Sequence, residues 1–457
     1  MYKKCKHIHF IGIGGIGMSG IAKILKLKGY TVSGCDECSK SKVISQLSEI
    51  GCKIYTGHNS DHIKDVDVLV YSSAVKPESP EVLAALTKGI PVIPRAIMLA
   101  ELMRTKYGIA VSGSHGKTTT TSMISHILME ANLDPTVIIG GILKNISNNA
   151  KLGEGNLLIA EADESDRSLL YLNPTFAIVT NIDAEHLDTY KDLEDVKDTF
   201  KNFLARLPFY GKAFLCIDDP NVKAILPLPH ISATKYGLSE AADIRGEIIN
   251  IKNSQSIFNV YKSNQILGQI TLNMPGEHNI LNSLAATALS LELDIPFKKI
   301  QNALNNFKGV ERRFEYKGSY KGADIFDDYG HHPTEIHNTL KIAINKKDKN
   351  LHVIFQPHKF SRTQKLWKEF IDVFDKREID NLYITDIYPA SEAPIENITS
   401  SRLVEEIKKR SPNLKIFYCK TYEEITQIVK DNLDTGDLLL TVGAGKVNLI
   451  GEKLLEL

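Results

Sequence analysis

The sequence predicts an α/β protein of three domains, and three observations support this prediction. At 457 residues the chain is too long for one ordinary hydrophobic core. Two glycine-rich turns, near residues 12 and 113, each follow a short apolar run and precede a helical pattern. Strand and helix patterns alternate again through the last third of the chain. We expect an N-terminal Rossmann-like domain (1–106), a central P-loop ATPase-type parallel sheet with a small antiparallel sheet (107–310), and a C-terminal Rossmann-like domain (311–457).

The composition is that of a globular protein without an electrostatic preference for nucleic acid or membranes. Charged residues make up 24% of the chain, and 55 basic residues balance 55 acidic ones. The longest apolar runs are too short to span a bilayer, and Met1–Phe10 leads into a glycine-rich segment without a signal-peptide cleavage pattern. We therefore expect a cytoplasmic protein with no nucleic-acid partner and no membrane insertion, present as a monomer or weak dimer.

The 6 cysteines show no pairing framework. Cys35 and Cys38 form a Cys-x-x-Cys, a spacing found in redox and metal chemistry. The chain has no second pair at zinc spacing, and this pair follows a strand pattern where a redox motif would open a helix. We expect ordinary reduced thiols.

A phosphate-binding loop is predicted where the apolar run Ile109–Val111 meets the turn Gly113–Gly116. Consecutive threonines and a helical pattern follow this turn. Backbone N–H groups of the turn and the helix N-terminus would face an anion, while Lys117 would reach the terminal phosphates and the Thr118 hydroxyl would ligate Mg²⁺. The loop is shorter than the usual P-loop, which would have glycine in place of Val111.

Acidic residues follow two further predicted strands of the central domain. The run Asn156–Ala160 precedes Glu161–Asp166, and Thr175–Val179 precedes Thr180–Asp188. An open parallel sheet places its ligands at the carboxyl ends of its strands. These residues are therefore candidates for the metal that accompanies a triphosphate, although some acids of the first segment could instead cap a helix.

The N-terminal segment predicts a first Rossmann unit. The strand His7–Ile13 leads into the glycines Gly12–Gly17 and a helix, and the next strand, Tyr30–Gly34, is followed by Asp36. Such glycines let the backbone approach a diphosphate, and the acid meets a ribose or base. The glycine string alone also fits NAD, FAD, a nucleotide sugar or a tight turn. Further strands of this sheet are expected at Val66–Tyr71 and Ile90–Ile93.

Two more segments predict ligand contacts. Turn-rich sequence over Asp243–Leu272 indicates antiparallel strands, and a helix starting after Gly276 places Asn279 and Asn282 on one face. These amides could read an adenine edge or satisfy nearby backbone, and the sequence leaves both open. In the third domain, four predicted strands are followed by segments rich in His, Arg and Tyr, which indicates an anion or amino-acid site. The strands are Ala323–Phe326, His352–Phe355, Leu382–Thr385 and Asp437–Thr441. The segments that follow them are, in the same order, Asp327–Pro333, Gln356–Arg362, Asp386–Ser391 and Gly443–Lys446.

Taken in order, these motifs resemble those of the Mur ligases of bacterial peptidoglycan synthesis, over essentially the whole chain. Within that family, His9–Ala22 and Tyr329–Pro333 are most similar to the member that joins L-alanine to UDP-N-acetylmuramate. The motifs that carry the resemblance are Ser112–Thr119, Glu161–Asp166, Thr180–Asp188, Gly276–Asn279, Arg312–Phe314 and Asp327–Pro333.

The resemblance implies a reaction. The muramate lactyl carboxylate attacks the γ-phosphate of ATP to give an acyl phosphate, and the amine of L-alanine then displaces phosphate. The implied cofactors are ATP and Mg²⁺, as two ions, with Mn²⁺ as a possible substitute. A carboxylate and a triphosphate repel each other, so Lys117 and Mg²⁺ must neutralise charge.

The resemblance also implies residue roles. The catalytic residues would be Lys117, Glu161, His186, Arg313 and His331. The ATP phosphates would contact Gly113, Ser114, His115, Gly116, Lys117, Thr118, Thr119 and Arg313. The adenosine would contact His278, Asn279 and Asn282, and the ribose would contact Asp328. Thr118 and Glu161 would hold one Mg²⁺, and His186 a second. The nucleotide sugar would contact Gly12, Gly14, Gly15, Gly17 and Asp36, with Ser72, Ser73 and Arg95. The amino acid would lie among Tyr329, His331, His358 and Arg362, with Arg362 pairing with its carboxylate and His331 taking the ammonium proton.

Two positions depart from family patterns. Lys359 replaces an arginine that some members have, so bidentate recognition is not expected there. Other members carry a carbamylated lysine at the second metal, whereas the matching position here is Phe200 with Lys201 beside it, and we assign neither a role.

Three rival functions remain open from the sequence. They are a ligase that joins a ready-made tripeptide to UDP-N-acetylmuramate, a nicotinamide-dependent oxidoreductase, and a non-catalytic nucleotide-binding regulator. An oxidoreductase function would not explain Lys117, Thr118 or the third domain.

Overall fold

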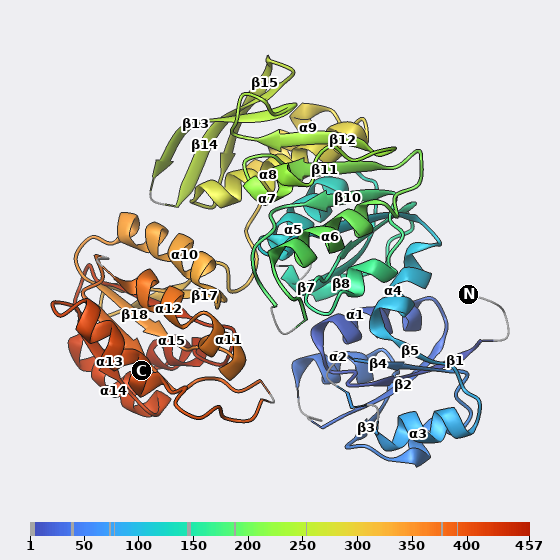
Figure 1. Cartoon of the computed structure of the whole chain (residues 1–457), viewed down its shortest axis with the longest axis horizontal. Helices are drawn as coiled ribbons and strands as arrows, with labels where there is room; N and C mark the ends of the chain where they lie inside the picture. Colours follow the sequence, from blue (N-terminus) through green and yellow to red (C-terminus); the bar gives the residue numbers. More distant parts are fainter. Residues whose placement is uncertain are drawn as a thin grey trace. The chain divides into compact units, whose positions relative to one another are not determined.

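The computed structural model describes residues 5–37, 41–72, 75–76, 78–143, 148–186, 189–252, 254–375, 378–390 and 392–457. Its strands form sheets of five, ten and six strands with helices packed on them, which confirms the predicted α/β class with three sheet-based domains (Figure 1). The chain divides into two compact units. The first unit is Met1–Ile249, Ile257–Asn273 and Asn279–Lys308, and the second is Asn250–Ser256, Met274–His278 and Gly309–Leu457. The domain boundaries at 106 and 310 stay predictions.

The N-terminal sheet is fully parallel, with the order β3-β2-β1-β4-β5. The predicted strands are present, and β3, which is half-exposed along its length, is an addition to them. The strands are β1 (His7–Ile11), β2 (Thr31–Asp36), β3 (Lys53–Thr56), β4 (Val68–Tyr71) and β5 (Val92–Pro94). The helices are α1 (Ile16–Leu27), α2 (Lys42–Glu49), η1 (Ser60–Ile63), α3 (Pro80–Thr87) and α4 (Arg95–Met103).

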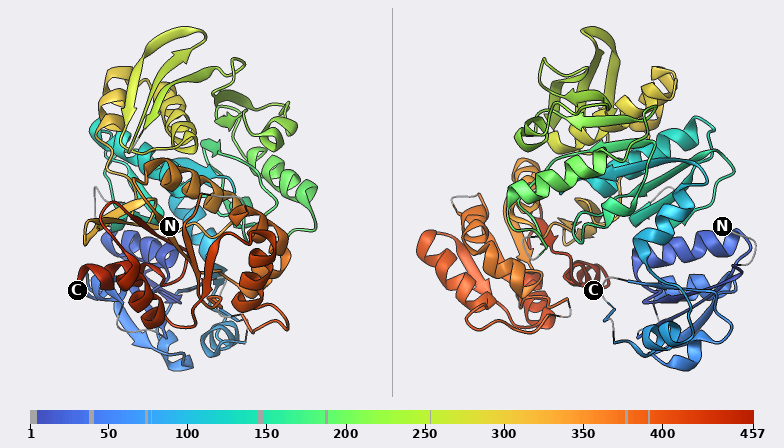
Figure 2. Two further views of the ribbon diagram at one scale, coloured as in Figure 1. Left: turned by 90° about the vertical axis from the view of Figure 1, so that its left-hand side faces the viewer. Right: turned by 45° about the vertical axis from the view of Figure 1, so that its right-hand side comes forward.

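The central sheet has the order β15-β14-β13-β12-β11-β10-β6-β9-β7-β8. The predicted antiparallel strands do not form a separate sheet, because β13 to β15 continue this one as long hairpins at its end (Figure 2). The β14–β15 turn consists of Ser263 and Asn264, whose φ angles of 47° and 68° suit a two-residue hairpin. The strands are β6 (Tyr107–Ser112), β7 (Thr136–Leu143), β8 (Asn148–Lys151), β9 (Leu157–Glu161), β10 (Phe176–Val179), β11 (Lys212–Cys216), β12 (Ser232–Gly237), β13 (Ile244–Lys252), β14 (Gln255–Lys262) and β15 (Gln265–Leu272).

The predicted strand and helix on either side of the phosphate loop are confirmed as β6 and α5 (Lys117–Glu130). Strand β6 lies between β10 and β9, and its Ile109, Ala110 and Val111 have no exposed surface. Helix α5 is buried from Thr119 to Leu128. The loop therefore projects from the centre of the sheet. The other helices here are η2 (Ser168–Tyr171), α6 (Leu193–Leu204), α7 (Pro220–Ala224), α8 (Glu277–Glu292) and α9 (Phe297–Asn305).

Within the first unit, α1 packs against β7 and β8 of the central sheet. A Cβ on Gly20 would lie 3.3 Å from Ile138, so the helix backbone approaches the sheet closely. The Asn149 amide donates hydrogen bonds to Ile16 O (2.7 Å) and Ser19 Oγ (2.9 Å). This contact fixes the helix that follows the glycine string against the central sheet.

The sheet of the second unit has the order β16-β17-β21-β18-β19-β20, with β16 antiparallel and the other pairs parallel. Alternate residues of β18 face two different cores, because Val353 and Phe355 belong to one cluster and Ile354 to another. Both faces of the sheet are therefore covered, as in a Rossmann-like domain. The four predicted strands are confirmed; β16 and β20 are additional.

The elements of this sheet are β16 (Glu315–Tyr320), β17 (Ala323–Asp328), β18 (Leu351–Phe355), β19 (Asn381–Ile384), β20 (Lys415–Tyr418) and β21 (Leu438–Val442). The helices are α10 (Pro333–Lys346), α11 (Phe360–Lys365), α12 (Trp367–Phe374), α13 (Ser400–Arg410), α14 (Tyr422–Asn432) and α15 (Asn448–Leu455). Among the described residues, no helix is both long enough and apolar enough to cross a bilayer.

Candidate active site

The loop between β6 and α5 depends on two glycines with positive φ. Gly113 has φ +131° and Gly116 has φ +82°, which side chains rarely allow. A Cβ on Gly113 would collide with Thr180 Oγ1, and one on Gly116 would lie 2.6 Å from Asn282 Oδ1. The tight turn thus requires glycine for both conformation and space.

The segment after β10 holds this loop in place. Ser114 Oγ accepts a hydrogen bond from Asp183 N (2.8 Å), and His115 N donates to Asn181 Oδ1 (2.8 Å). Thr180 Oγ1 donates to His115 O at 2.6 Å. The predicted strand-end motif therefore braces the loop. Its last two members, Leu187 and Asp188, lie outside the described residues.

Lys117, at the start of α5, is folded back over the loop. Its Nζ donates to Gly113 O (2.6 Å), Ser114 O (3.1 Å) and Glu164 Oε1 (2.8 Å). Burial lowers the pKa of Lys117, but the negative charges of Glu164 and Asp163 outweigh burial and raise its pKa above the usual value. The ammonium group is therefore charged and lies within the phosphate loop.

Two residues predicted to share a metal ion are in contact. Thr118 Oγ1 donates to Glu161 Oε2 at 3.1 Å. The other oxygen of Glu161 accepts from Gly140 N at 2.7 Å, which fixes the carboxylate beside the hydroxyl. The hydroxyl from the first turn of α5 and the carboxylate from the end of β9 form an oxygen donor pair suited to Mg²⁺.

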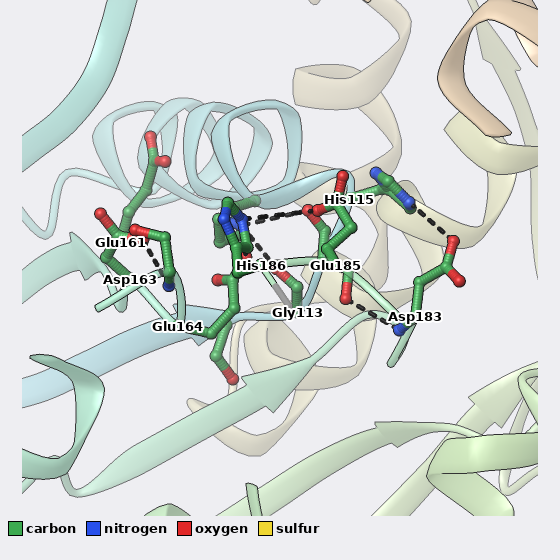
Figure 3. A network of polar contacts seen from close by, with 12 residues as sticks. Gly113, His115, Glu161, Asp163, Glu164, Asp183, Glu185 and His186 are labelled. Carbon is green, nitrogen blue, oxygen red and sulfur yellow. Dashed lines mark hydrogen bonds and ion pairs between the residues drawn. The ribbon is translucent and has the colours of Figure 1, made fainter. Parts of the chain in front are cut away.

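Next to this pair, Glu164, Glu185 and His186 bring their ligand atoms within 4.8 Å of one another (Figure 3). His186 Nε2 lies 3.6 Å from Glu164 Oε1 and 3.7 Å from Glu185 Oε2. Glu164 is 2% exposed, and its Oε2 has no hydrogen-bond partner among the described residues. Burial raises the pKa of Glu164 to about 7 despite Lys117, which lowers it. A cation would satisfy the orphaned oxygen, so the donor set fits a metal ion.

The sequence motif contained Glu164 but did not single it out from its acidic neighbours. Two of these neighbours bond to nearby backbone, although neither is the N-cap of η2, which is Arg167. Asp163 Oδ1 accepts from Ser165 N (3.0 Å), and Asp166 Oδ1 accepts from Ser168 N (2.9 Å) at the start of η2.

The predicted nucleotide-sugar residues gather around the first glycine string. Gly14 N donates to Asp36 Oδ2 (2.9 Å), and a Cβ on Gly12 would lie 3.5 Å from Ser72 Cβ. A Cβ on Gly17 would lie 3.1 Å from Arg95 Nη1. Gly15 N closes the turn by donating to Gly12 O (3.2 Å), and Ser73 lies outside the described residues.

Arg95 connects this string to the acidic segment of the central sheet. Its Nη2 lies 3.4 Å from Asp163 Oδ2. Burial raises the pKa of Asp163. The positive charges of Lys117 and then of Arg95 lower this pKa by a larger amount, so it lies below the usual value. Asp163 is thus an anion between the Arg95 guanidinium and the Lys117 ammonium.

Near the phosphate loop, α8 presents the predicted asparagines. Asn279 and Asn282 are 5% and 6% exposed, and the Asn282 side chain lies beside Gly116. This places one amide at the loop, whereas the choice between adenine contact and backbone support stays open. His278, just before them, belongs to the second unit.

In the second unit, two neighbouring arginines differ in their surroundings. Arg312 donates to Asp327 Oδ2 (2.8 Å), Gly443 O (2.7 Å) and Gly445 O (3.1 Å), so it ties the ends of β17 and β21 together. Arg313 Nη1 lies 3.7 Å from Glu335 Oε1. Both guanidinium groups lie over the Tyr329 ring, at 5.0 and 5.5 Å from its centroid.

Asp328 is buried and already bonded to the backbone. Its Oδ2 accepts from Phe314 N (2.8 Å) and its Oδ1 from Gly330 N (2.7 Å). Burial raises the pKa of Asp328 to about 6, although Arg313 lowers it. The carboxylate therefore shapes the turns on either side of it, and a ribose contact would use its remaining lone pairs.

The predicted amino-acid residues form one cluster. His331 lies 5.6 Å from both the Tyr329 and the His358 ring centroids, and Arg362 Nη1 lies 3.4 Å from His358 Nδ1. The Tyr388 ring stacks on His358 at 5.4 Å, a contact that sequence reasoning did not identify because it crosses from β18 to the segment after β19. Burial, then His331, Arg362 and Lys359, lower the pKa of His358 to about 3.

Comparison with known proteins agrees with this arrangement. Sequence models of the Mur ligase family, described as catalytic domain, middle domain and glutamate ligase domain, match residues 7–107, 111–290 and 312–445. The fold and the site therefore define a class of protein, and the chain belongs to the Mur ligase family.

Relatives within the family indicate a particular member. The UDP-N-acetylmuramate--L-alanine ligase of Geotalea daltonii is 49% identical over 100% of this chain and 99% of its own length. The structure of the UDP-N-acetylmuramate-alanine ligase of Thermotoga maritima has a TM-score of 0.82 at 26% identity and covers 98% of both chains. A murein peptide ligase of Psychrobacter arcticus shares the fold, with a TM-score of 0.73 at 23% identity over 99% of this chain and 98% of its own.

Proposed function

We propose that this chain is an ATP-dependent ligase that joins L-alanine to the lactyl carboxylate of UDP-N-acetylmuramate, releasing ADP and phosphate, in peptidoglycan precursor synthesis. The proposal is supported by 49% identity over the full length of this chain to a relative named UDP-N-acetylmuramate--L-alanine ligase. The observation that carries it is the arrangement at the phosphate loop, where Lys117 meets Glu164 and Thr118 meets Glu161. We also propose that the protein acts in the cytoplasm as a monomer or weak dimer.

We assign the ATP phosphates to the turn from Gly113 to Thr119. The turn offers backbone N–H groups and a helix N-terminus, which favour an anion. Lys117 would exchange its bonds to Gly113 O and Ser114 O for bonds to the phosphates. This exchange places a cation between the triphosphate and the attacking carboxylate, which otherwise repel each other.

We assign a first Mg²⁺ to Thr118 and Glu161, and a second to His186 together with Glu164 and Glu185, with Mn²⁺ as a possible substitute. The bound ions would neutralise phosphate charge. Phe200 is fully buried, and Lys201 pairs with Asp198 on the surface at 3.2 Å, so neither is assigned to the metal. Removing the metal with a chelator should abolish ADP release, and adding Mg²⁺ back should restore it.

We assign the adenosine to His278, Asn279 and Asn282, the ribose to Asp328, and a phosphate contact to Arg313. The nucleotide sugar is assigned to the glycine string, Asp36, Ser72 and Arg95. The string has backbone N–H groups and Arg95 supplies a cation, which suits the diphosphate of the sugar nucleotide. Asp36 already supports the string through Gly14.

We assign L-alanine to the cluster of Tyr329, His331, His358 and Arg362, with Arg362 on the substrate carboxylate. His331 Nδ1 lies 3.1 Å from Tyr329 O. A carbonyl oxygen only accepts hydrogen bonds, so in the neutral ring Nδ1 carries the hydrogen and Nε2 is the basic nitrogen. His331 is therefore our candidate base for the ammonium proton.

The role of His331 is tested with His331→Ala at saturating L-alanine. We expect kcat to fall by about 100-fold, the scale of general-base catalysis, with little change in the KM for ATP. Turnover near that of the wild type would show that another group takes the proton.

The function itself is tested by measuring ADP release with UDP-N-acetylmuramate, ATP and Mg²⁺ while offering L-alanine, glycine, L-serine or the tripeptide in turn. Release that depends on L-alanine is expected. Release only with the tripeptide would assign the chain to peptide recycling, and NADH consumption without ATP would exclude both ligase functions.

A further inference from the structure

A second group of metal-ligating side chains lies in the N-terminal domain, on elements that do not form the phosphate loop. Cys35 is on β2, His58 follows β3, and Glu81 is in the first turn of α3. The ligand atoms of these three residues lie within 4.8 Å of one another. His9 of β1 and His62 of η1 form a second such group with the same Cys35.

The separations within the first group match the edges of a metal tetrahedron. Cys35 Sγ lies 3.5 Å from His58 Nδ1 and 3.3 Å from Glu81 Oε1. His58 Nδ1 lies 3.4 Å from the same Glu81 oxygen. Tetrahedral Zn²⁺ with ligands at about 2.0–2.3 Å gives ligand-to-ligand edges of roughly 3.3–3.6 Å. One ion can therefore contact all three atoms with little rearrangement.

Two adjacent imidazoles offer a further ligand. His62 Nδ1 lies 3.3 Å from Glu81 Oε1, and the His62 ring stacks on Tyr55 at 4.3 Å. His9 has no exposed surface, and its Nδ1 lies 2.8 Å from Ser33 Oγ. The other ring nitrogen of His9, Nε2, is buried without a hydrogen-bond partner among the described residues. One ring nitrogen of His9 lies within 4.8 Å of Cys35 Sγ, and hydrogen bonding does not explain its orphaned Nε2.

Burial and access also suit a bound ion. Cys35 and Glu81 have no exposed surface, whereas the His58 side chain is 30% exposed and provides an entry path. Hydrogen bonds without a metal are the alternative, because Glu81 Oε1 accepts from Asn59 N (2.8 Å) and Oε2 from Ser79 Oγ (2.7 Å). That alternative accounts for Glu81 but leaves His9 Nε2 orphaned.

We propose that Cys35, His58 and Glu81 bind one transition-metal ion, with Zn²⁺ as the best match, and that an imidazole of the adjacent pair His9 and His62 completes the coordination. A thiolate with imidazole and carboxylate ligands selects Zn²⁺ over Mg²⁺ or Ca²⁺. The ion joins β2, the segment after β3 and the start of α3. Cys35 immediately precedes Asp36, whose carboxylate accepts a hydrogen bond from Gly14 N. The ion therefore supports the glycine string by fixing the end of β2.

Cobalt is the probe for this site, because a thiolate bound to Co²⁺ gives a charge-transfer band in the near ultraviolet. The full chain, freed of any affinity tag and stripped with a chelator, is titrated with Co²⁺ in excess Mg²⁺ and ADP, which occupy the phosphate loop. We expect one equivalent of Co²⁺ to produce the band, and Zn²⁺ to displace it. Zn²⁺ should also raise the thermal midpoint of the wild type.

Matched variants assign the ligands. Cys35→Ser should lose the band, whereas Cys52→Ser, which alters another buried thiol of the same domain, should keep it. His58→Ala, at the more exposed ligand, should weaken Co²⁺ binding by at least about tenfold. Far-ultraviolet circular dichroism of each metal-free variant shows whether the chain is folded. The proposal would be overturned if the folded wild type gave no band or if the band survived Cys35→Ser. A band kept in Cys35→Ser but lost in Cys38→Ser would also overturn it.

Discussion

At the residue scale, the Lys117 side chain is folded back over the loop between β6 and α5. Its ammonium group bonds to two loop carbonyls and Glu164, and fixed carboxylates keep it charged. Under the proposed function, ATP binding would replace these hydrogen bonds of Lys117 and leave Glu164 available for a metal ion.

Lys117→Ala should lower kcat for ADP release by about 100-fold or more, because it removes a charge-stabilising donor at the transferred phosphate. Lys201→Ala is the control, since Lys201 pairs with Asp198 on the exposed side of α6. The control should retain wild-type kcat. An inactive Lys201→Ala variant would instead indicate a metal role for that lysine.

The pKa of His358 makes the stability of the second unit depend on pH. Its folded pKa of about 3 lies below the ordinary value of 6.5, so the unfolded chain binds more protons between these values. This contribution to stability is complete above pH 6.5 and is lost as the pH falls towards 3. His358→Asn should therefore reduce the loss of stability between pH 7 and pH 5, by about 1–2 kcal/mol.

This pH dependence is measured as thermal midpoints of both proteins at pH 7 and pH 5. His230→Asn, at an exposed histidine with φ +63°, is the control and should follow the wild type. Equal losses in His358→Asn and wild type would show that this imidazole is not kept neutral by burial.

At the element scale, the strand–turn–helix unit of β6 and α5 depends on glycines whose conformation other residues resist. Gly116 begins α5 in the left-handed region and its missing side chain leaves room for Asn282. The helix N-terminus therefore meets α8 directly at the loop.

Gly116→Ala should destabilise the first unit and prevent ATP binding at concentrations that saturate the wild type. Gly29→Ala is a matched control, because Gly29 has a similar φ of +90° but nothing within 4 Å of the place where a Cβ would lie. The control should cost only about 1 kcal/mol of conformational strain and leave ADP release intact. Thermal denaturation and nucleotide titration of both variants provide the comparison. Equal effects would mean that the space beside Asn282 is unimportant.

At the scale of the whole molecule, the chain has two compact units with separate cores. Leu215 is fully buried in the first unit and Leu340 in the second. Separate cores permit separate unfolding, since two-state behaviour holds for single domains and fails for larger assemblies of them.

Calorimetry should resolve two unfolding transitions. Leu215→Ala and Leu340→Ala should each destabilise one unit by about 2–5 kcal/mol, the usual effect of truncating a buried leucine. Each variant should move a different transition and leave the other in place. A single transition shifted equally by both substitutions would show that the two units unfold together.

The sequence alone determined the class of fold and the motifs at several strand ends. These depend on neighbours along the chain, because apolar runs, glycine turns and helical periodicity are local. Among the strands that it did not predict, three lie at sheet edges: β3 and β20 are largely exposed, and β16 alternates only weakly. It also missed β7, β8, β11 and β12 of the central sheet, although β11 is buried beyond its first residue. Edge strands lack the continuous apolar run that marks a buried strand.

Only the tertiary structure decided which of several similar neighbours does which task. It separated Glu164, beside Lys117 and His186, from Asp163 and Asp166, which bond to nearby backbone. It paired Arg312 with Asp327, whereas Arg313 lies beside Glu335. It also brought Cys35, His58 and Glu81 together from three separate elements. Such contacts join residues far apart in the chain, and their distances are set by how helices and strands pack, which no local pattern encodes.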